Sequence, residues 1–82
     1  MAVYPNPATG ASVVNFQLER PGPVTVSLLD ETGRFVRSVV RDTAFPAGPQ
    51  QVPLPLHNLA AGLYFVRLET EGFSYGEKLV VK

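Results

Sequence analysis

The segment GLYFVRLETEGFSYGEKLVV, residues 62–81, holds two runs of alternating side chains around a glycine turn. Successive residues of an extended chain point to opposite faces, so the first run predicts a strand over residues 62–70. One face of this strand carries Tyr64, Val66 and Leu68, and the other carries Leu63, Phe65 and Arg67. Glu71-Gly72 predicts a tight turn, and residues 73–82 complete a hairpin. The return strand has Tyr75, Leu79 and Val81 on one side.

The same alternation recurs upstream, with turn signals about every ten residues. It predicts strands over residues 12–18, 24–28, 34–41 and 51–56, and a seventh strand near Val3-Tyr4. Residues 20–23 (RPGP) predict a turn, and 30–33 (DETG) predict a type I turn closed by a left-handed glycine. Residues 42–50 are expected to form a loop, and 57–62 a short connection with room for one helical turn. Pro53 and Pro55 place their strand at a sheet edge.

These elements predict an all-β fold, an antiparallel immunoglobulin-like β-sandwich of about seven strands. The expected core is formed by one face of each strand. Its predicted members are Val14, Phe16, Val26, Leu28, Leu54, Tyr64, Val66, Leu68, Leu79 and Val81.

Composition limits the classes of function. The 82 residues suffice for one small domain, and a hydrophobic content of 45 % is typical of globular chains. A formal net charge of zero argues against a general nucleic-acid binder. The chain has no cysteine, which excludes disulfides and thiolate chemistry. Met1 and Ala2 look like an added start, so we expect a single domain over residues 3–82, taken from a longer protein.

Residues that could carry catalysis are scarce. His57 is the single histidine and lies in a predicted connection, where a surface role is more common than a catalytic one. The four serines fall in strand patterns, and no nucleophile elbow is present. One histidine without cysteine does not build a zinc site, and Asp30-Glu31 lacks the calcium-binding ladder. We therefore expect no catalytic, metal or cofactor site.

Surface residues leave two binding functions open. Tyr4 and Tyr75 are candidates for exposed aromatic rings that stack on sugars, whereas Tyr64 has core spacing. Arg34, Arg37 and Arg41 form a basic stripe, of which strand alternation lets only Arg37 and Arg41 share a face. A solvated strand face and contact with an acidic partner both fit this stripe.

Three motifs, taken in order, resemble the C-terminal sorting domain of the type IX secretion system. They are YPNP at residues 4–7, L-x-x-G-L-Y at 59–64, and the closing K-L-V-V-K at 78–82. The resemblance covers the chain from Val3 to Lys82. It identifies Pro5, Asn6, Pro7, Gly62, Tyr64, Lys78 and Lys82 as sorting-motif residues.

The resemblance implies a non-catalytic signal at the C-terminus of a larger exported cargo protein. Such domains pass through the periplasm, are recognised folded at an outer-membrane translocon, and in many members are removed by a sortase-like peptidase. The cargo then reaches the cell surface or the medium. YPNP would form a rigid junction between the cargo linker and the sandwich. Two alternatives remain open: an accessory carbohydrate-binding module of an extracellular polysaccharidase, and a fibronectin-like spacer.

Overall fold

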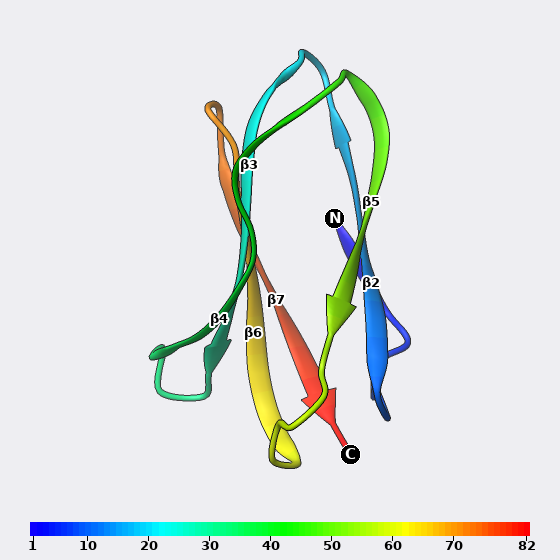
Figure 1. Cartoon of the computed structure of the whole chain (residues 1–82), viewed down its shortest axis with the longest axis vertical. Helices are drawn as coiled ribbons and strands as arrows, with labels where there is room; N and C mark the ends of the chain where they lie inside the picture. Colours follow the sequence, from blue (N-terminus) through cyan, green and yellow to red (C-terminus); the bar gives the residue numbers. More distant parts are fainter.

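The computed structural model describes residues 1–82 as two facing antiparallel sheets (Figure 1). The smaller sheet has the order β1 (Ala2–Tyr4), β2 (Ala11–Leu18) and β5 (Gly48–Pro55). The larger sheet has the order β4 (Phe35–Phe45), β3 (Gly22–Asp30), β6 (Gly62–Glu69) and β7 (Ser74–Val81). The prediction of an all-β antiparallel sandwich of seven strands is confirmed, including the strand near Val3-Tyr4.

The core lies between the sheets. It is formed by the alternate side chains of the strands that point toward the opposite sheet. All ten residues predicted for it are buried, with Tyr64 the most exposed at 8 %. Six more apolar residues join them: Val3, Ala8, Leu18, Val24, Val52 and Leu56. Burial of this apolar surface is the main term that stabilises the fold. The structure contains no helix that could span a membrane.

The turn chemistry predicted for the β3–β4 hairpin is confirmed. The Gly33 amide donates to the Asp30 carbonyl at 3.0 Å, which closes the turn, and Gly33 has a φ of 86°. The Asp30 carboxylate accepts hydrogen bonds from the Thr32 hydroxyl (2.6 Å), the Thr32 amide (2.9 Å) and the Arg34 amide (3.0 Å). These bonds, the Thr32 hydroxyl first, hold the pKa of Asp30 below its usual value.

The expected loop over residues 42–50 is wrong, because strand structure continues through most of it. β4 runs to Phe45 and β5 begins at Gly48. Phe45 packs edge-on against Phe16 with ring centroids 5.7 Å apart, a tertiary contact that outweighs the local proline and glycine signal. The helical turn considered for residues 57–62 is also absent. The chain turns there through Asn58, which has a φ of 62°.

The predicted edge position of residues 51–56 is confirmed, since β5 pairs only with β2. Pro49, Pro53 and Pro55 lie opposite Gln17, Val13 and Ala11 of β2. Prolines have no amide to donate, so they discourage a further strand from pairing with the free edge of β5.

The predicted pairing of Arg37 and Arg41 on one face is wrong, because three register shifts interrupt β4. A β-bulge adds a residue to one strand and so reverses the alternation beyond it. Arg37 lies opposite the buried Leu28 and donates from its guanidinium to the Pro55 and His57 carbonyls at 2.9 and 3.0 Å. It joins the open edges of the two sheets, whereas Arg41 is exposed beyond the bulge.

Candidate functional site

The predicted sorting-motif residues come from three segments and meet at the end of β7, at the bottom of Figure 1. Pro5, Asn6 and Pro7 lie in the segment that leaves β1. Gly62 is the first residue of β6 and pairs with Val81, and Tyr64 pairs with Leu79. Segments more than seventy residues apart in the sequence are therefore neighbours at one end of the sandwich.

Asn6 holds the backbone of β7 from the side. Its Nδ2 donates to the Lys78 carbonyl at 2.8 Å, and its Oδ1 accepts from the Val80 amide at 3.0 Å. The side chain thus satisfies a donor and an acceptor on the free edge of a strand, in place of a neighbouring strand. An amide side chain suits this task because it carries both a donor and an acceptor.

Ala8 continues the same contact along β7. Its amide donates to the Val80 carbonyl at 2.8 Å, its carbonyl accepts from the Lys82 amide at 2.8 Å, and its side chain is fully buried. Ala8 forms an isolated parallel bridge with Val81. We name Asn6, Ala8 and the β7 backbone from Lys78 to Lys82 the β7 clasp.

YPNP, predicted to form the junction between the cargo linker and the sandwich, is itself part of the sandwich. Its first residue, Tyr4, is the last residue of β1 and pairs with Val13 of β2, and the segment then leads into the β7 clasp. The peptide bonds before Pro5 and Pro7 are both cis. The Pro5 carbonyl accepts a hydrogen bond of 2.6 Å from the hydroxyl of Ser12, which is itself buried.

Sequence reasoning missed Ala8 and Ser12 as parts of this site. Neither alanine nor serine indicates such a role by residue type alone. The partners of Ala8 lie more than seventy residues away, and Ser12 becomes buried only when the sheets pack together. The usable signal for Ser12 was a hydroxyl at the start of a strand whose alternate residues are apolar.

Gly62 and Tyr64 shape the entry to β6. Gly62 has a φ of 157° with nothing within 4 Å of where a Cβ would lie, so the backbone rather than the available space favours glycine. The Tyr64 hydroxyl donates to the Ala60 carbonyl at 2.6 Å, as expected for a buried tyrosine. This bond ties the connection from β5 to the core.

Lys78 and Lys82 remain free at the surface. Both are exposed, and neither takes part in an ion pair, since the only one in the chain joins Arg67 and Glu69 at 3.4 Å. The residues of the β7 clasp can therefore offer two ammonium groups to a partner, on a strand whose backbone is held in place.

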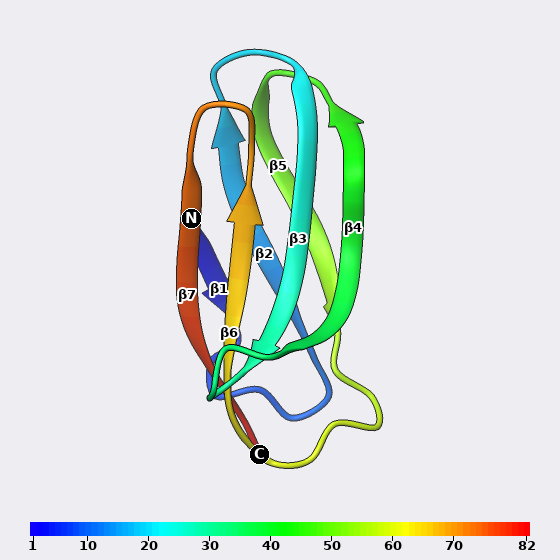
Figure 2. The same cartoon turned by 90° about the vertical axis from the view of Figure 1, so that its left-hand side faces the viewer.

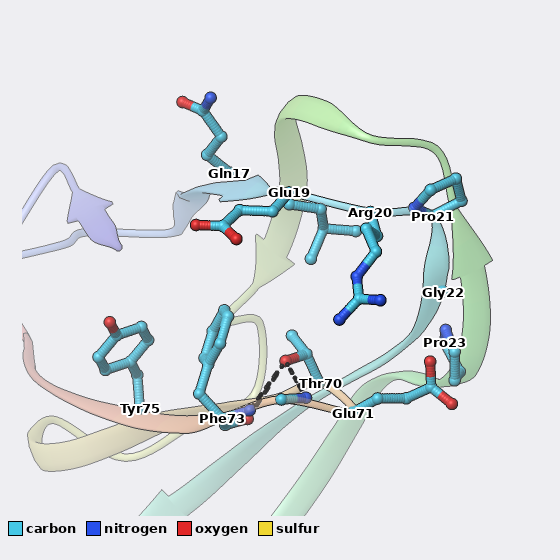
Figure 3. A pocket seen from close by; sticks show the side chains of 12 residues that line it. Gln17, Glu19, Arg20, Pro21, Gly22, Pro23, Thr70, Glu71, Phe73 and Tyr75 are labelled. Atoms are coloured by element: carbon cyan, nitrogen blue, oxygen red, sulfur yellow. Dashed lines mark hydrogen bonds between the residues drawn. The ribbon is translucent and has the colours of Figure 1, made fainter.

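A cleft of about 620 Å³ lies at the opposite end of the sandwich (Figure 3). Phe73 and Tyr75 form its aromatic side, with ring centroids 4.8 Å apart, and are 37 % and 52 % exposed. Glu19 and Arg20 point into it from the β2–β3 connection, and neither side chain has a hydrogen-bond or ion-pair partner. Tyr4, also exposed, lies away from this cleft and accepts hydrogen bonds from Asn15 and Gln51.

The candidate catalytic and metal-binding residues are not brought together. The His57 side chain is exposed, and only its carbonyl is used, by Arg37. Ser12 and Ser27 are buried. No group of three or more His, Cys, Asp or Glu side chains is placed to hold a metal ion.

Comparison with known proteins bears on the motifs that meet in the β7 clasp. A search of curated proteins gave no match. The family model for the secretion system C-terminal sorting domain matches residues 2–82, essentially the whole chain. The chain therefore belongs to the family of type IX secretion C-terminal sorting domains.

Proposed function

We propose that this domain is a non-catalytic sorting signal that directs a larger cargo protein across the outer membrane through the type IX secretion system. The observation that supports the proposal is the β7 clasp, in which Asn6 and Ala8 bind the backbone of β7 and Lys78 and Lys82 are exposed and unpaired. A clasp that fixes a strand and presents two cations has the properties of a recognition surface.

In this proposal the cargo precedes the domain in the parent protein and passes with it through the periplasm. The outer-membrane translocon binds the folded domain, and a sortase-like peptidase cuts ahead of it. The cargo is then attached to the cell surface or released. Pro5, Asn6, Pro7, Gly62 and Tyr64 serve by shaping the clasp, and Lys78 and Lys82 serve by contact.

A reporter fusion tests this function. Residues 1–82 are placed after a signal peptide and a reporter, in a host with a working type IX system, and the reporter is measured at the surface, in the medium and in the periplasm. The parent fusion should be exported. Deletion of residues 78–82 removes Leu79 and Val81 from the core together with both lysines, so that fusion should stay in the periplasm.

Substitution of Lys78 and Lys82 by Gln separates folding from recognition. Exposed charges contribute little to stability, so the double variant should fold, and any loss of export then reports recognition. If the deleted fusion were exported as well as the parent, the sorting function would have to be abandoned.

The cleft at the far end favours carbohydrate binding as a second candidate function. Two exposed aromatic rings beside unpaired polar side chains suit sugar stacking and hydrogen bonding. Affinity electrophoresis in gels containing soluble polysaccharides, with Tyr75→Ala as the comparison, tests it. Retardation of the parent but not of the variant would support this function, and equal mobility of both in every polysaccharide would remove it.

A further inference from the structure

An apolar patch lies on the outer face of the four-stranded sheet, at the end that carries the β7 clasp. Phe35, Leu29 and Phe65 are direct cross-strand neighbours in one row, and this row ends on Lys78 at the β7 edge. Leu63 and Val80 are paired in the next row. We name Leu29, Phe35, Leu63, Phe65 and Val80 the outer patch. Figure 2 views this face, with the patch strands meeting toward the bottom.

The outer patch does not belong to the core. Its side chains alternate with the buried Leu28, Tyr64 and Leu79, so they point away from the other sheet. Phe35 is 55 % exposed and Val80 is 37 % exposed. The β3–β4 turn passes in front of β6 at this end of the face (Figure 2), and Leu29, Leu63 and Phe65 are half-buried. The open part of the patch is therefore formed by Phe35 and Val80.

The apolar character is confined to one half of this face. In the register above the patch, Ser27 lies opposite Arg67, and Arg67 lies opposite Gly76. An outer face that only contacts solvent would not require its apolar side chains to be gathered at one end. Clustered exposed apolar side chains with a polar surround are typical of protein interaction sites.

The patch is also continuous with the sorting motifs. Leu63 stands between Gly62 and Tyr64, and Val80 stands within the closing motif, yet neither is fully buried. Folding alone explains the inward residues of these motifs and the hydrogen bonds from the Asn6 side chain to the β7 backbone, but not the apolar residue at the exposed position of Val80.

Charge around the patch indicates the kind of partner. Lys78 ends the first row, and Lys82 follows the strand that carries Val80; both ammonium groups lack a carboxylate partner. The nearby Asp30 carboxylate is already occupied by hydrogen bonds within its own turn. A protein surface with apolar side chains beside carboxylates would be complementary to this arrangement.

We propose that the outer patch is the docking surface for the export machinery, through an apolar protein surface flanked by acidic side chains that face Lys78 and Lys82. This inference rests on the proposed sorting function. Strands about 4.8 Å apart give the first row a width of roughly 14 Å. That suits the apolar centre of a small interface, with the lysines in its polar rim.

Paired variants of the reporter fusion test the proposal. Phe35→Gln removes the most exposed ring of the patch, and Phe73→Gln makes the same change at the far end of the domain. Lys78→Glu reverses a charge beside the patch, and Arg41→Glu makes the same change in net charge away from it. Circular dichroism and thermal melting of each isolated domain verify that the variants fold like the parent.

We expect Phe35→Gln to bind the machinery about tenfold more weakly or worse, as for an aromatic residue central to an interface. The Phe35→Gln and Lys78→Glu fusions should accumulate folded in the periplasm, and the Phe73→Gln and Arg41→Glu fusions should be exported like the parent. Val80→Thr, a change of similar volume, should reduce export without lowering the melting temperature.

Three other outcomes would overturn the docking surface, both proposals, or the choice of partner. Export of Phe35→Gln and Lys78→Glu at the parent level overturns the docking surface, while export of the parent leaves the sorting function standing. A parent fusion that stays in the periplasm overturns both. If sedimentation shows a dimer of the parent that Phe35→Gln dissociates, the patch binds a second copy of the chain and the proposed partner is wrong.

Discussion

Replacing Asn6 with Ala should destabilise the domain through β7, at the opposite end of the chain. The variant loses the hydrogen bonds to the Lys78 carbonyl and from the Val80 amide. One such bond contributes about 0.5–1.5 kcal/mol net, so the two together contribute about 1–3 kcal/mol. In a domain of this size 1 kcal/mol shifts the melting temperature by about 4–8 °C, so we expect a decrease on the order of 10 °C.

Thermal melting followed by circular dichroism measures this effect, and amide hydrogen exchange locates it. Asn15→Ala is the matched control, because Asn15 Nδ2 makes one hydrogen bond of 3.1 Å to the exposed Tyr4 hydroxyl. It should change the melting temperature by only a few degrees. Exchange should accelerate at Val80 and Lys82 in the Asn6 variant. A decrease no larger than that of Asn15→Ala, or unchanged exchange at Val80, would refute the clasp.

Three further predictions concern the core, the first hairpin and metal ions. Phe16→Ala or Leu68→Ala should cost about 2–5 kcal/mol in urea unfolding, and a cost below 1 kcal/mol would contradict the burial of these residues. The folded-state pKa of Asp30 is lowered, so the stability that its carboxylate contributes is present at neutral pH and is lost as the pH falls through that pKa. The melting temperature of Asp30→Asn should therefore decline less steeply than that of the parent below about pH 4. An equally steep decline in both proteins would contradict this role of Asp30. Calcium or zinc should leave the melting temperature unchanged, and a rise of several degrees would reveal a native-state site.

The strands could be predicted from sequence because their burial pattern is local. In β6 the alternation of Tyr64, Val66 and Leu68 predicts which face meets the core, and these three residues are buried in the structure. The same holds for the β3–β4 turn, where Asp30 and Gly33 act within a few residues of each other. Local rules suffice wherever the deciding contacts are local.

Prediction failed where distant contacts decide the structure. The bulges that separate Arg37 from Arg41 leave no mark in the alternation, because they are fixed by pairing with β3. Phe45 becomes a strand residue through Phe16, despite the prolines that follow it. The resemblance located Asn6, but no local rule says that its amide reaches a strand more than seventy residues away.

The geometry divides the proposed sorting-motif residues and their neighbours in β7 into residues that build the domain and residues whose side chains make no polar contact within it. Leu79 and Val81 point inward, and Asn6 and Ala8 use the backbone of the same strand. Lys78 and Lys82, by contrast, contribute no hydrogen bond or ion pair from their side chains. Deleting the closing motif therefore removes both kinds of residue at once, and a loss of export on deletion cannot distinguish misfolding from lost recognition. Only substitutions at outward positions, in a domain verified to be folded, can assign recognition to this end of the sandwich.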